Sequence, residues 1–157
     1  MKITLIQTGK TADNNITAGI EEYSQRIRKY APFEIITIPD LKNTKNMPLD
    51  EQKIREGERI VQLISNDDFV ILLDEKGKEF STREFSGQLE KFFLISKKRL
   101  VFIIGGAYGF SLEIYGKADL KISLSRMTFS HQMVRLLFTE QLYRALSIIK
   151  GDPYHHD

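Results

Sequence analysis

The spacing of apolar residues along the chain switches repeatedly between a strand-like and a helix-like pattern. Short continuous runs of apolar or β-branched residues predict strands, and apolar residues three and four positions apart predict amphipathic helices. The runs predict strands over residues 3–6, 33–38, 69–73, 100–104 and 120–124. The periodic segments predict helices over residues 16–30, 49–64, 81–95 and 130–150, with a shorter helical stretch over 111–116. This alternation is typical of an α/β fold in which helices flank a mostly parallel sheet.

Local signals support several of these boundaries. Ser81 and Glu84 have the spacing of a capping box that opens a helix, and Ser130 can cap the last helix. The charged segment 74–78, which contains Gly77, predicts a turn after the third strand.

The last predicted helix is apolar on more than one side, with Phe138, Leu142 and Leu146 among its apolar residues. A helix with this pattern is buried on more than one side. In so short a chain we expect the second partner to be another copy of the protein, which predicts a homodimer.

Length and composition exclude several classes of protein. The chain has 157 residues, which predicts a single domain over residues 1–157. It contains no cysteine, so disulfides, zinc–thiolate sites, iron–sulfur clusters and cysteine nucleophiles are excluded. No apolar run approaches the roughly 18 residues that span a bilayer, and the first six residues lack the apolar stretch of a signal peptide. We therefore expect a cytoplasmic protein with no membrane partner.

The charge balance allows an RNA partner without requiring one. The formal net charge of +2 is too small for binding that depends mainly on counterion release. Two basic runs, Arg26–Lys29 and Lys97–Arg99, could contact RNA. The alternative is that both runs are solvated ends of helices or loops.

Ligands of parallel sheets bind beyond the carboxyl ends of the strands, which directs attention to the loops after Leu73, Ile104 and Leu124. The second of these loops, residues 105–109, has three glycines in five residues, and glycine allows positive φ or close approach of a ligand. It is neither a P-loop nor a dinucleotide fingerprint. The loop is either a ligand-binding turn or an ordinary tight turn.

The loop after Leu124 is rich in hydroxyl groups and leads into the last helix. Its main-chain groups and its hydroxyls could hold an adenosine-like ligand, and the alternative is that they only cap the helix.

The C-terminal tail ends in Tyr154, His155 and His156 after a Gly-Asp-Pro bend. An aromatic ring followed by histidine suits stacking on an unpaired RNA base, although a frayed end is the usual fate of a terminus. With only three histidines and no cysteine, we expect no metal site.

Five segments of the chain are distinctive: the opening residues 1–3, the run 104–110 (IGGAYGF), the segments 127–135 (MTFSHQMVR) and 140–145 (EQLYRA), and the tail 153–156 (PYHH). Together they resemble the RlmH family of SPOUT-superfamily methyltransferases. The resemblance covers the whole chain. The family often has proline where this chain has Ser130, which can still cap the helix.

The resemblance implies a fold with a C-terminal trefoil knot, a homodimer, and S-adenosyl-L-methionine as cofactor. It also implies methylation of N3 of a pseudouridine in large-subunit (23S) ribosomal RNA, with the assembled ribosome as the expected partner. The family's cofactor contacts fall on Leu73, Gly105, Leu124, Ser125, Arg126, Met127, Thr128 and Phe129.

A methyl acceptor of this kind must lose a proton, so a general base is useful. His131 and His155 are candidates, and Arg144 could stabilise negative charge on the acceptor. The alternatives are that His131 only packs or caps, and that Arg144 forms an ion pair with Glu140 four positions earlier. Tyr154, His155 and His156 are the candidates for contact with the substrate RNA.

Two other classes of function stay open. A non-enzymatic RNA- or ribosome-binding module would need only the basic residues. A nucleotide-dependent oxidoreductase is disfavoured because the acidic residue expected about 20 positions after a dinucleotide fingerprint is absent.

Overall fold

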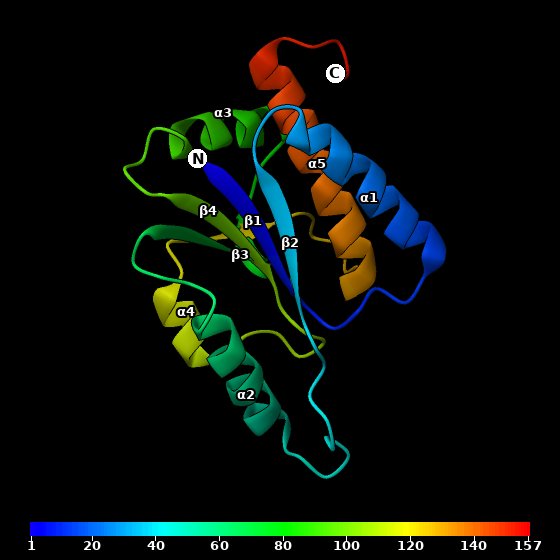
Figure 1. The fold of residues 1–157 in the computed structure, drawn as a ribbon, viewed down its shortest axis with the longest axis vertical. Coiled ribbons are helices and arrows are strands. Elements are labelled where there is room, and N and C mark those ends of the chain that lie inside the picture. The colour runs from blue at the N-terminus through cyan, green and yellow to red at the C-terminus, as the bar shows by residue number, and fades with distance from the viewer.

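The computed structural model describes residues 1–157, in which five parallel strands form one sheet in the order β2-β1-β4-β3-β5 (Figure 1). The strands are β1 (Lys2–Thr8), β2 (Phe33–Ile38), β3 (Asp68–Glu79), β4 (Arg99–Ile104) and β5 (Leu120–Ser123). The apolar runs of β1, β3 and β4 occupy the middle of the sheet and are buried. Strands covered on both faces read as continuous apolar runs, which explains their sequence.

Helices cover both faces of the sheet (Figure 1). One face carries α1 (Asn14–Arg28), α3 (Thr82–Phe92) and α5 (His131–Lys150), and the other carries α2 (Leu49–Val61) and α4 (Leu112–Lys117). Each face has its own apolar core. The predicted α/β class with a mostly parallel, helix-flanked sheet is therefore confirmed. None of the helices is long and apolar enough to span a membrane.

The predicted caps are present. Ser81 and Glu84 form a capping box at the start of α3, because the Glu84 amide donates to Ser81 Oγ and the Ser81 amide donates to Glu84 Oε2. At the start of α5, the Met133 amide donates to Ser130 Oγ at 3.2 Å. These bonds satisfy amide groups that a helix leaves without partners in its first turn.

One predicted boundary is wrong. The charged segment 74–78 does not end the third strand, because β3 continues to Glu79 after a shift of register: Leu73 and Lys78 both pair with Ile122. The chain between them passes close over β5, and a Cβ on Gly77 would lie 2.6 Å from the backbone of Ile122. Glycine permits this approach, which no periodicity of apolar residues could indicate.

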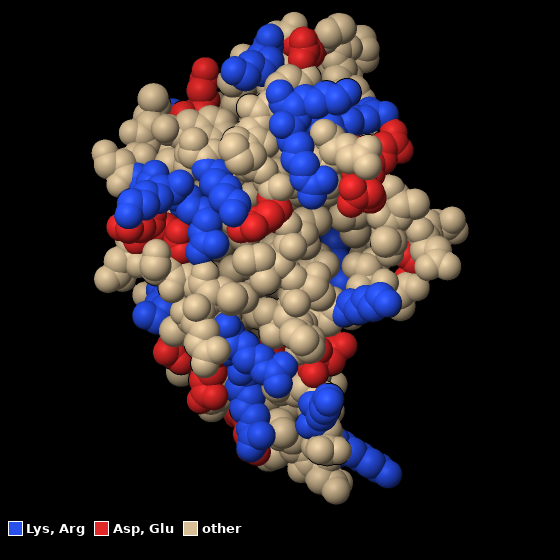
Figure 2. Space-filling model, viewed as in Figure 1, with Lys and Arg blue, Asp and Glu red and all other residues tan.

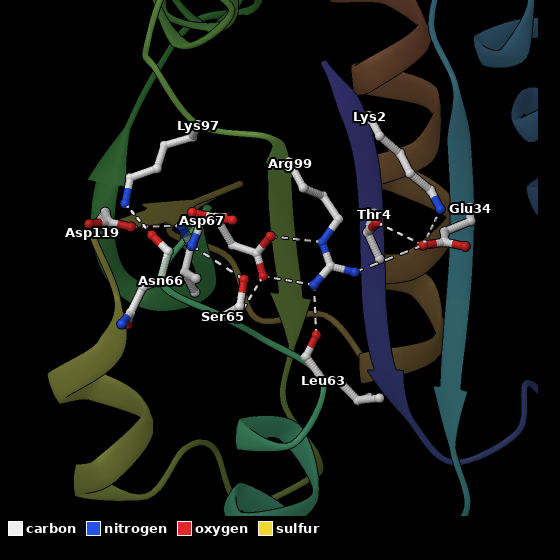
Figure 3. Close-up of polar contacts among 12 residues, drawn as sticks. Lys2, Thr4, Glu34, Leu63, Ser65, Asn66, Asp67, Lys97, Arg99 and Asp119 are labelled. Carbon is white, nitrogen blue, oxygen red and sulfur yellow. Dashed lines mark hydrogen bonds and ion pairs between the residues drawn. The ribbon is translucent and has the colours of Figure 1, made fainter.

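An ion-pair network connects the strands at the edge of the sheet formed by their amino ends, the amino edge (Figure 3). Arg99 donates to both carboxylate oxygens of Asp68, at 2.9 and 2.7 Å, and to the carbonyl oxygen of Leu63 at 2.7 Å. Glu34 accepts from Thr4 and pairs with Lys2 beside this group. The network joins the first residues of neighbouring strands, at the edge opposite to the predicted ligand loops.

The two apolar sides of α5 are explained within one chain. Phe138, Leu142 and Leu146 are buried in the core that α5 shares with the sheet, α1 and α3. The argument that took these three residues as the surface for a second copy was therefore wrong. The homodimer itself stays a prediction, and its surface would have to be one that a single chain leaves exposed.

Candidate functional site

The second half of β3, with the residues just after it, and the loops after β4 and β5 surround three neighbouring hollows. The hollows lie at the edge of the sheet formed by the carboxyl ends of the strands, the carboxyl edge. The largest, of ≈ 710 Å³, lies between residues 104–110, the segment 73–76 and the start of α5. A second, of ≈ 360 Å³, lies between the loop after β5, the start of α3 and the middle of α5. A third, of ≈ 70 Å³, adjoins both. Leu73 and Phe129 line all three, so these hollows meet around two apolar side chains.

Seven of the eight expected cofactor residues line these hollows. They are Leu73, Gly105, Leu124, Ser125, Met127, Thr128 and Phe129. The exception is Arg126, whose side chain is 88% exposed and lies 3.9 Å from Glu79. The fold thus brings three separate strand ends to one place, and contact of these residues with a cofactor stays a prediction.

The glycine-rich loop is a tight turn that also forms a wall of the largest hollow. The Gly109 amide donates to the carbonyl oxygen of Gly106 at 3.2 Å, and Gly109 has a φ of 86°, which glycine adopts without strain. Gly105 is crowded from within the loop, because a Cβ there would lie 3.2 Å from the ring of Phe110. The two interpretations of this loop are therefore compatible.

The hydroxyl groups of the loop after β5 shape the loop itself. Ser123 Oγ donates to the carbonyl oxygen of Ser125, and the Met127 amide donates to Ser125 Oγ, both at 2.9 Å. With the cap from Ser130, these bonds fix the path of the chain into α5. They leave main-chain groups and the exposed rings and methyl groups of this loop to face a ligand.

The wall of the largest hollow that β3 forms carries two carboxylates, Asp74 and Glu75. Tyr115 donates a hydrogen bond to Asp74, and burial and this bond raise the pKa of Tyr115 to about 12. The other Asp74 oxygen accepts from the Lys76 amide at 2.8 Å. Glu75 is exposed, lines two of the hollows and makes no ion pair within the chain. It is the carboxylate in this wall that is available to a positively charged ligand.

The C-terminal tail folds back onto the end of α5. Gly151 ends the helix with a φ of 75°, and the Asp152 amide donates to the carbonyl oxygen of Ser147 at 2.9 Å. The ring of Tyr154 lies 4.5 Å from that of Tyr143, and its hydroxyl donates to Glu140 at 3.1 Å. The tail is therefore held by specific contacts at this point.

Two of the candidate residues, Arg144 and His155, contact each other near the C-terminal end of α5. Arg144 forms the ion pair with Glu140 that its spacing predicts, with Nε donating at 2.9 Å, and Arg144 Nη1 lies 3.3 Å from His155 Nδ1. His155 Nε2 lies 2.8 Å from Asp157, which also accepts from Arg83 at 2.7 Å. His156 is exposed and makes none of these contacts. No group of three or more His, Asp or Glu side chains is placed to hold a metal ion.

The structure divides the proposed catalytic residues into two groups. His131 is exposed at the first turn of α5 and lines the largest hollow. Arg144 and His155 lie near the other end of the same helix. At a rise of about 1.5 Å per residue, the 13 positions from His131 to Arg144 correspond to about 20 Å along the helix axis. Within one chain these groups cannot act on the same acceptor atom.

Most residues that line the largest hollow were not among the predicted site residues. Lys53, Glu75, Tyr108 and Tyr115 are four polar or charged examples. Tyr108 is 54% exposed in the glycine-rich loop, and its position in that motif could have indicated it. Lys53 reaches the hollow from α2, the helix on the other face of the sheet, and nothing in its local sequence marks it.

Comparison with known proteins gives a match over almost the whole chain. Residues 1–155 match the family model described as "Predicted SPOUT methyltransferase". The chain is 56% identical over 156 residues to the ribosomal RNA large subunit methyltransferase H of Christiangramia forsetii, covering 99% of each chain. It is 52% identical to the protein of the same name from Parabacteroides distasonis, covering 100% of each chain.

Solved structures with little sequence identity share the fold. A probable methyltransferase from Bordetella pertussis matches with a TM-score of 0.58 at 12% identity, covering 92% of this chain and 94% of that one. The SpoU methyltransferase AviRb from Streptomyces viridochromogenes, solved in complex with AdoMet, matches with a TM-score of 0.50 at 14% identity. That match covers 96% of this chain and 59% of AviRb.

Proposed function

Because the chain belongs to the SPOUT methyltransferase family, together with the ribosomal RNA large subunit methyltransferases H, we propose that it methylates N3 of a pseudouridine in large-subunit ribosomal RNA. The proposed methyl donor is S-adenosylmethionine, and the proposed active form is a homodimer with a knotted C-terminal region. The observation that carries the proposal is the meeting of three strand-end loops around Leu73 and Phe129.

The hollows fit S-adenosylmethionine in size and in chemistry. Small-molecule sites commonly have volumes of roughly 300–1,000 Å³ and apolar walls with a few polar groups. The largest hollow, of ≈ 710 Å³, has apolar side chains such as Ile104 and Val134 for a flat ring, and Lys53 for a carboxylate. Glu75 supplies the negative charge that suits an ammonium or sulfonium group.

When bound, S-adenosylmethionine supplies an electrophilic methyl group on a positively charged sulfur. The contribution of the chain is to hold the acceptor nitrogen in line with that methyl group, because orientation supplies most of the advantage in such a displacement. The acceptor imide must also lose its proton. In our proposal His131 or His155 accepts this proton and Arg144 stabilises the negative charge that results. His131 could share the acceptor only with an Arg144 from a second copy of the chain.

A homodimer would bring the two groups of candidates together. The side of α5 that carries Met133, Leu137 and Ile148 is only partly buried within the chain. If a second copy packs there with its α5 antiparallel, the partner's tail lies beside the cofactor loops of the first copy. The tail would then present Tyr154 and His156 to a uracil-like base, and the separation of about 20 Å within one chain would cease to matter.

The test of the proposed function measures cofactor binding and methyl transfer separately. We expect the purified protein to bind S-adenosylmethionine in calorimetry. We also expect it to transfer a labelled methyl group to ribosomes that lack the modification, with N3-methylpseudouridine as the product in mass spectrometry. Isolated rRNA, large subunits and assembled ribosomes should be compared as substrates. A protein that binds RNA but neither retains nor consumes S-adenosylmethionine would instead be a binding module.

Removal of residues 152–157 should separate the two halves of the site. We expect the shortened protein to keep its affinity for S-adenosylmethionine, because the tail lines none of the three hollows. Methyl transfer should fall at least a hundredfold, since a misplaced acceptor loses much of the orientation advantage. Near-normal transfer by the shortened protein would show that His131 or Arg144 is sufficient on the acceptor side.

A further inference from the structure

A groove lined by lysine side chains adjoins the largest hollow. It has a volume of ≈ 430 Å³ and is lined by Lys76, Lys78 and Lys121, together with Tyr115 and Asp119. Lys76 and Tyr115 also line the largest hollow, so the groove and the hollow share a wall. A strand of RNA whose target base reaches the methyl donor at the mouth of the largest hollow would have neighbouring phosphates within reach of the groove.

The lysines of this groove form no ion pair within the chain, although Lys78 adds to the hydrogen bonds from Ser81 in lowering the pKa of Glu84. All three lysines are exposed. Lys121 Nζ lies 5.4 Å from the centre of the Tyr115 ring, and Lys78 Nζ lies 5.1 Å from that of Phe80. Asp119 is the acidic residue of the groove, and its carboxylate already accepts a hydrogen bond from the Val70 amide at 2.8 Å.

Unlike the groove lysines, three residues of the two basic runs form ion pairs with carboxylates of the chain. Arg26 pairs with Glu22 and Arg28 with Glu21, and Lys98 pairs with Asp67. Figure 2 shows charges of both signs side by side over α1, at the upper right. Lys97 donates to the carbonyl oxygen of Asn66. A carboxylate that is already paired with a cation competes with phosphate, so Arg26, Arg28 and Lys98 are poor phosphate sites.

The groove exists because of the irregularity in β3. The shift of register between Leu73 and Lys78 pushes the segment 74–77 over β5, where Gly77 touches the backbone of Ile122. This places Lys76 and Lys78 beside Lys121, which is 43 positions later in the sequence. The cluster is thus built by the fold and cannot be found as a basic run.

We propose that Lys76, Lys78 and Lys121 bind the phosphodiester backbone of the substrate RNA next to the nucleotide that is methylated. The proposal deepens the proposed function and rests on it for the identity of the substrate. Lysine is suited to this task because its ammonium group contacts phosphate as a compact charge, without reading the base sequence.

The test compares two triple variants with the same change of charge. The groove variant is Lys76→Gln, Lys78→Gln and Lys121→Gln, and the control is Lys29→Gln, Lys97→Gln and Lys98→Gln in the basic runs. Binding of a fluorescent 12-nucleotide single-stranded RNA is measured by anisotropy over a range of salt concentrations. Methyl transfer to large ribosomal subunits and affinity for S-adenosylmethionine are measured on the same proteins.

We expect the groove variant to bind RNA about a hundredfold more weakly at 0.1 M salt, with unchanged affinity for S-adenosylmethionine. Its slope of log K against log salt should be smaller in magnitude by about 2, since each phosphate contact on a single strand contributes about 0.7. The control should keep the parent's slope. Replacement of the same three groove lysines by arginine should restore binding, because the charge is kept.

The groove proposal and the proposed function fail in different ways. A groove variant that binds and methylates like the control would overturn the groove. A parent protein that binds no RNA would overturn it as well. If the parent binds RNA through the groove but transfers no methyl group, the groove stands and the proposed methyltransferase reaction falls.

Discussion

Each of the two edges of the sheet holds one arginine, partly buried at the amino edge and fully buried at the carboxyl edge, and the two have different partners. At the amino edge, Arg99 donates to both oxygens of Asp68 and to the carbonyl oxygen of Leu63 (Figure 3). At the carboxyl edge, Arg135 is completely buried and touches no carboxylate. It donates to Thr11 Oγ1 at 2.8 Å and to the carbonyl oxygen of Thr8 at 2.6 Å, and its Nε has no partner.

The pKa values of the charged groups also differ between the two edges: the charged forms are favoured at the amino edge and disfavoured at the carboxyl edge. The carboxylate of Asp68 raises the pKa of Arg99, whereas burial lowers the pKa of Arg135. Burial alone would raise the pKa of Asp68, but hydrogen bonds from Arg99 and from the Ser65 amide bring it below its usual value. At the other edge, burial and the charge of Asp40 raise the pKa of Glu56.

Unsatisfied polar atoms collect at the carboxyl edge. The buried side-chain atoms without a hydrogen-bond partner are Gln7 Oε1, Thr8 Oγ1 and Arg135 Nε. Gln7 and Thr8 end β1, next to the strand that leads into the glycine-rich loop. Such atoms cost stability, and functional sites are where proteins commonly accept that cost. The amino edge thus stabilises the sheet, whereas the unsatisfied atoms lie at the carboxyl edge, where the hollows are, although Gln7, Thr8 and Arg135 themselves line none of the three.

The largest expected effect follows from removing the arginine of the amino edge. Arg99→Met leaves the Asp68 carboxylate buried without its cation, which commonly costs about 3–5 kcal/mol of unfolding free energy. Urea unfolding measures this loss. Lys98→Met is the control, because its ion pair with Asp67 is exposed, and it should leave the midpoint unchanged.

The pH dependence of the same variant provides a second measurement. A carboxyl group whose folded pKa is lowered contributes stability above its unfolded value of about 3.8. That contribution is lost as the pH falls below 3.8 through the folded pKa. In Arg99→Met this loss at acid pH should largely disappear. An Arg99→Met protein as stable as the control would show that the amino edge is not what fastens the sheet.

A smaller effect is expected from the matching substitution at the carboxyl edge. Arg135→Met removes two hydrogen bonds but also a buried, unpaired charge, and the second change offsets part of the first. We expect a loss of no more than about 2 kcal/mol, which is smaller than the loss expected for Arg99→Met. Methyl transfer should fall more than stability does, because Arg135 holds the end of β1 against α5. A loss as large as that of Arg99→Met would remove the contrast between the edges.

The sequence predicts the elements that depend on local patterns, and it does not predict the features that depend on contacts between distant segments. The strands and helices were predicted in order, because each has its own apolar period or run and its own cap, as Ser81 and Ser130 illustrate. The loops that form the site were indicated by their place after buried strands. The two residues that join the hollows, Leu73 and Phe129, came from the family resemblance.

The rest depends on contacts between distant segments. The extension of β3 rests on Gly77 lying against Ile122, and the lysine groove rests on that extension. The burial of α5 on two sides was predicted correctly, but its partners are α1 and α3 of the same chain. Neither partner could be identified from the pattern of α5 alone. The pairing of Arg99 with Asp68 likewise joins strands that are 31 positions apart.

The smallest expected effect concerns Glu56, a carboxyl group at the carboxyl edge, whose pKa is raised where that of Asp68 at the amino edge is lowered. Glu56 has a raised pKa, so its folded form binds a proton more tightly than its unfolded form does, and its charge destabilises the protein at neutral pH. This penalty shrinks as the pH falls through the raised pKa and vanishes below the unfolded value of about 4.5. Glu56→Gln should therefore increase the unfolding free energy at pH 7 by about 0.5 kcal/mol, with no gain at pH 4.

Glu51→Gln is the control on the same helix, since Glu51 pairs with Arg55 and should give no gain at either pH. Urea unfolding at both pH values measures the difference. A Glu56→Gln protein that is less stable at pH 7 would mean that the carboxylate beside Gly106 has a favourable partner, and that the carboxyl edge is better satisfied than its hydrogen bonds indicate.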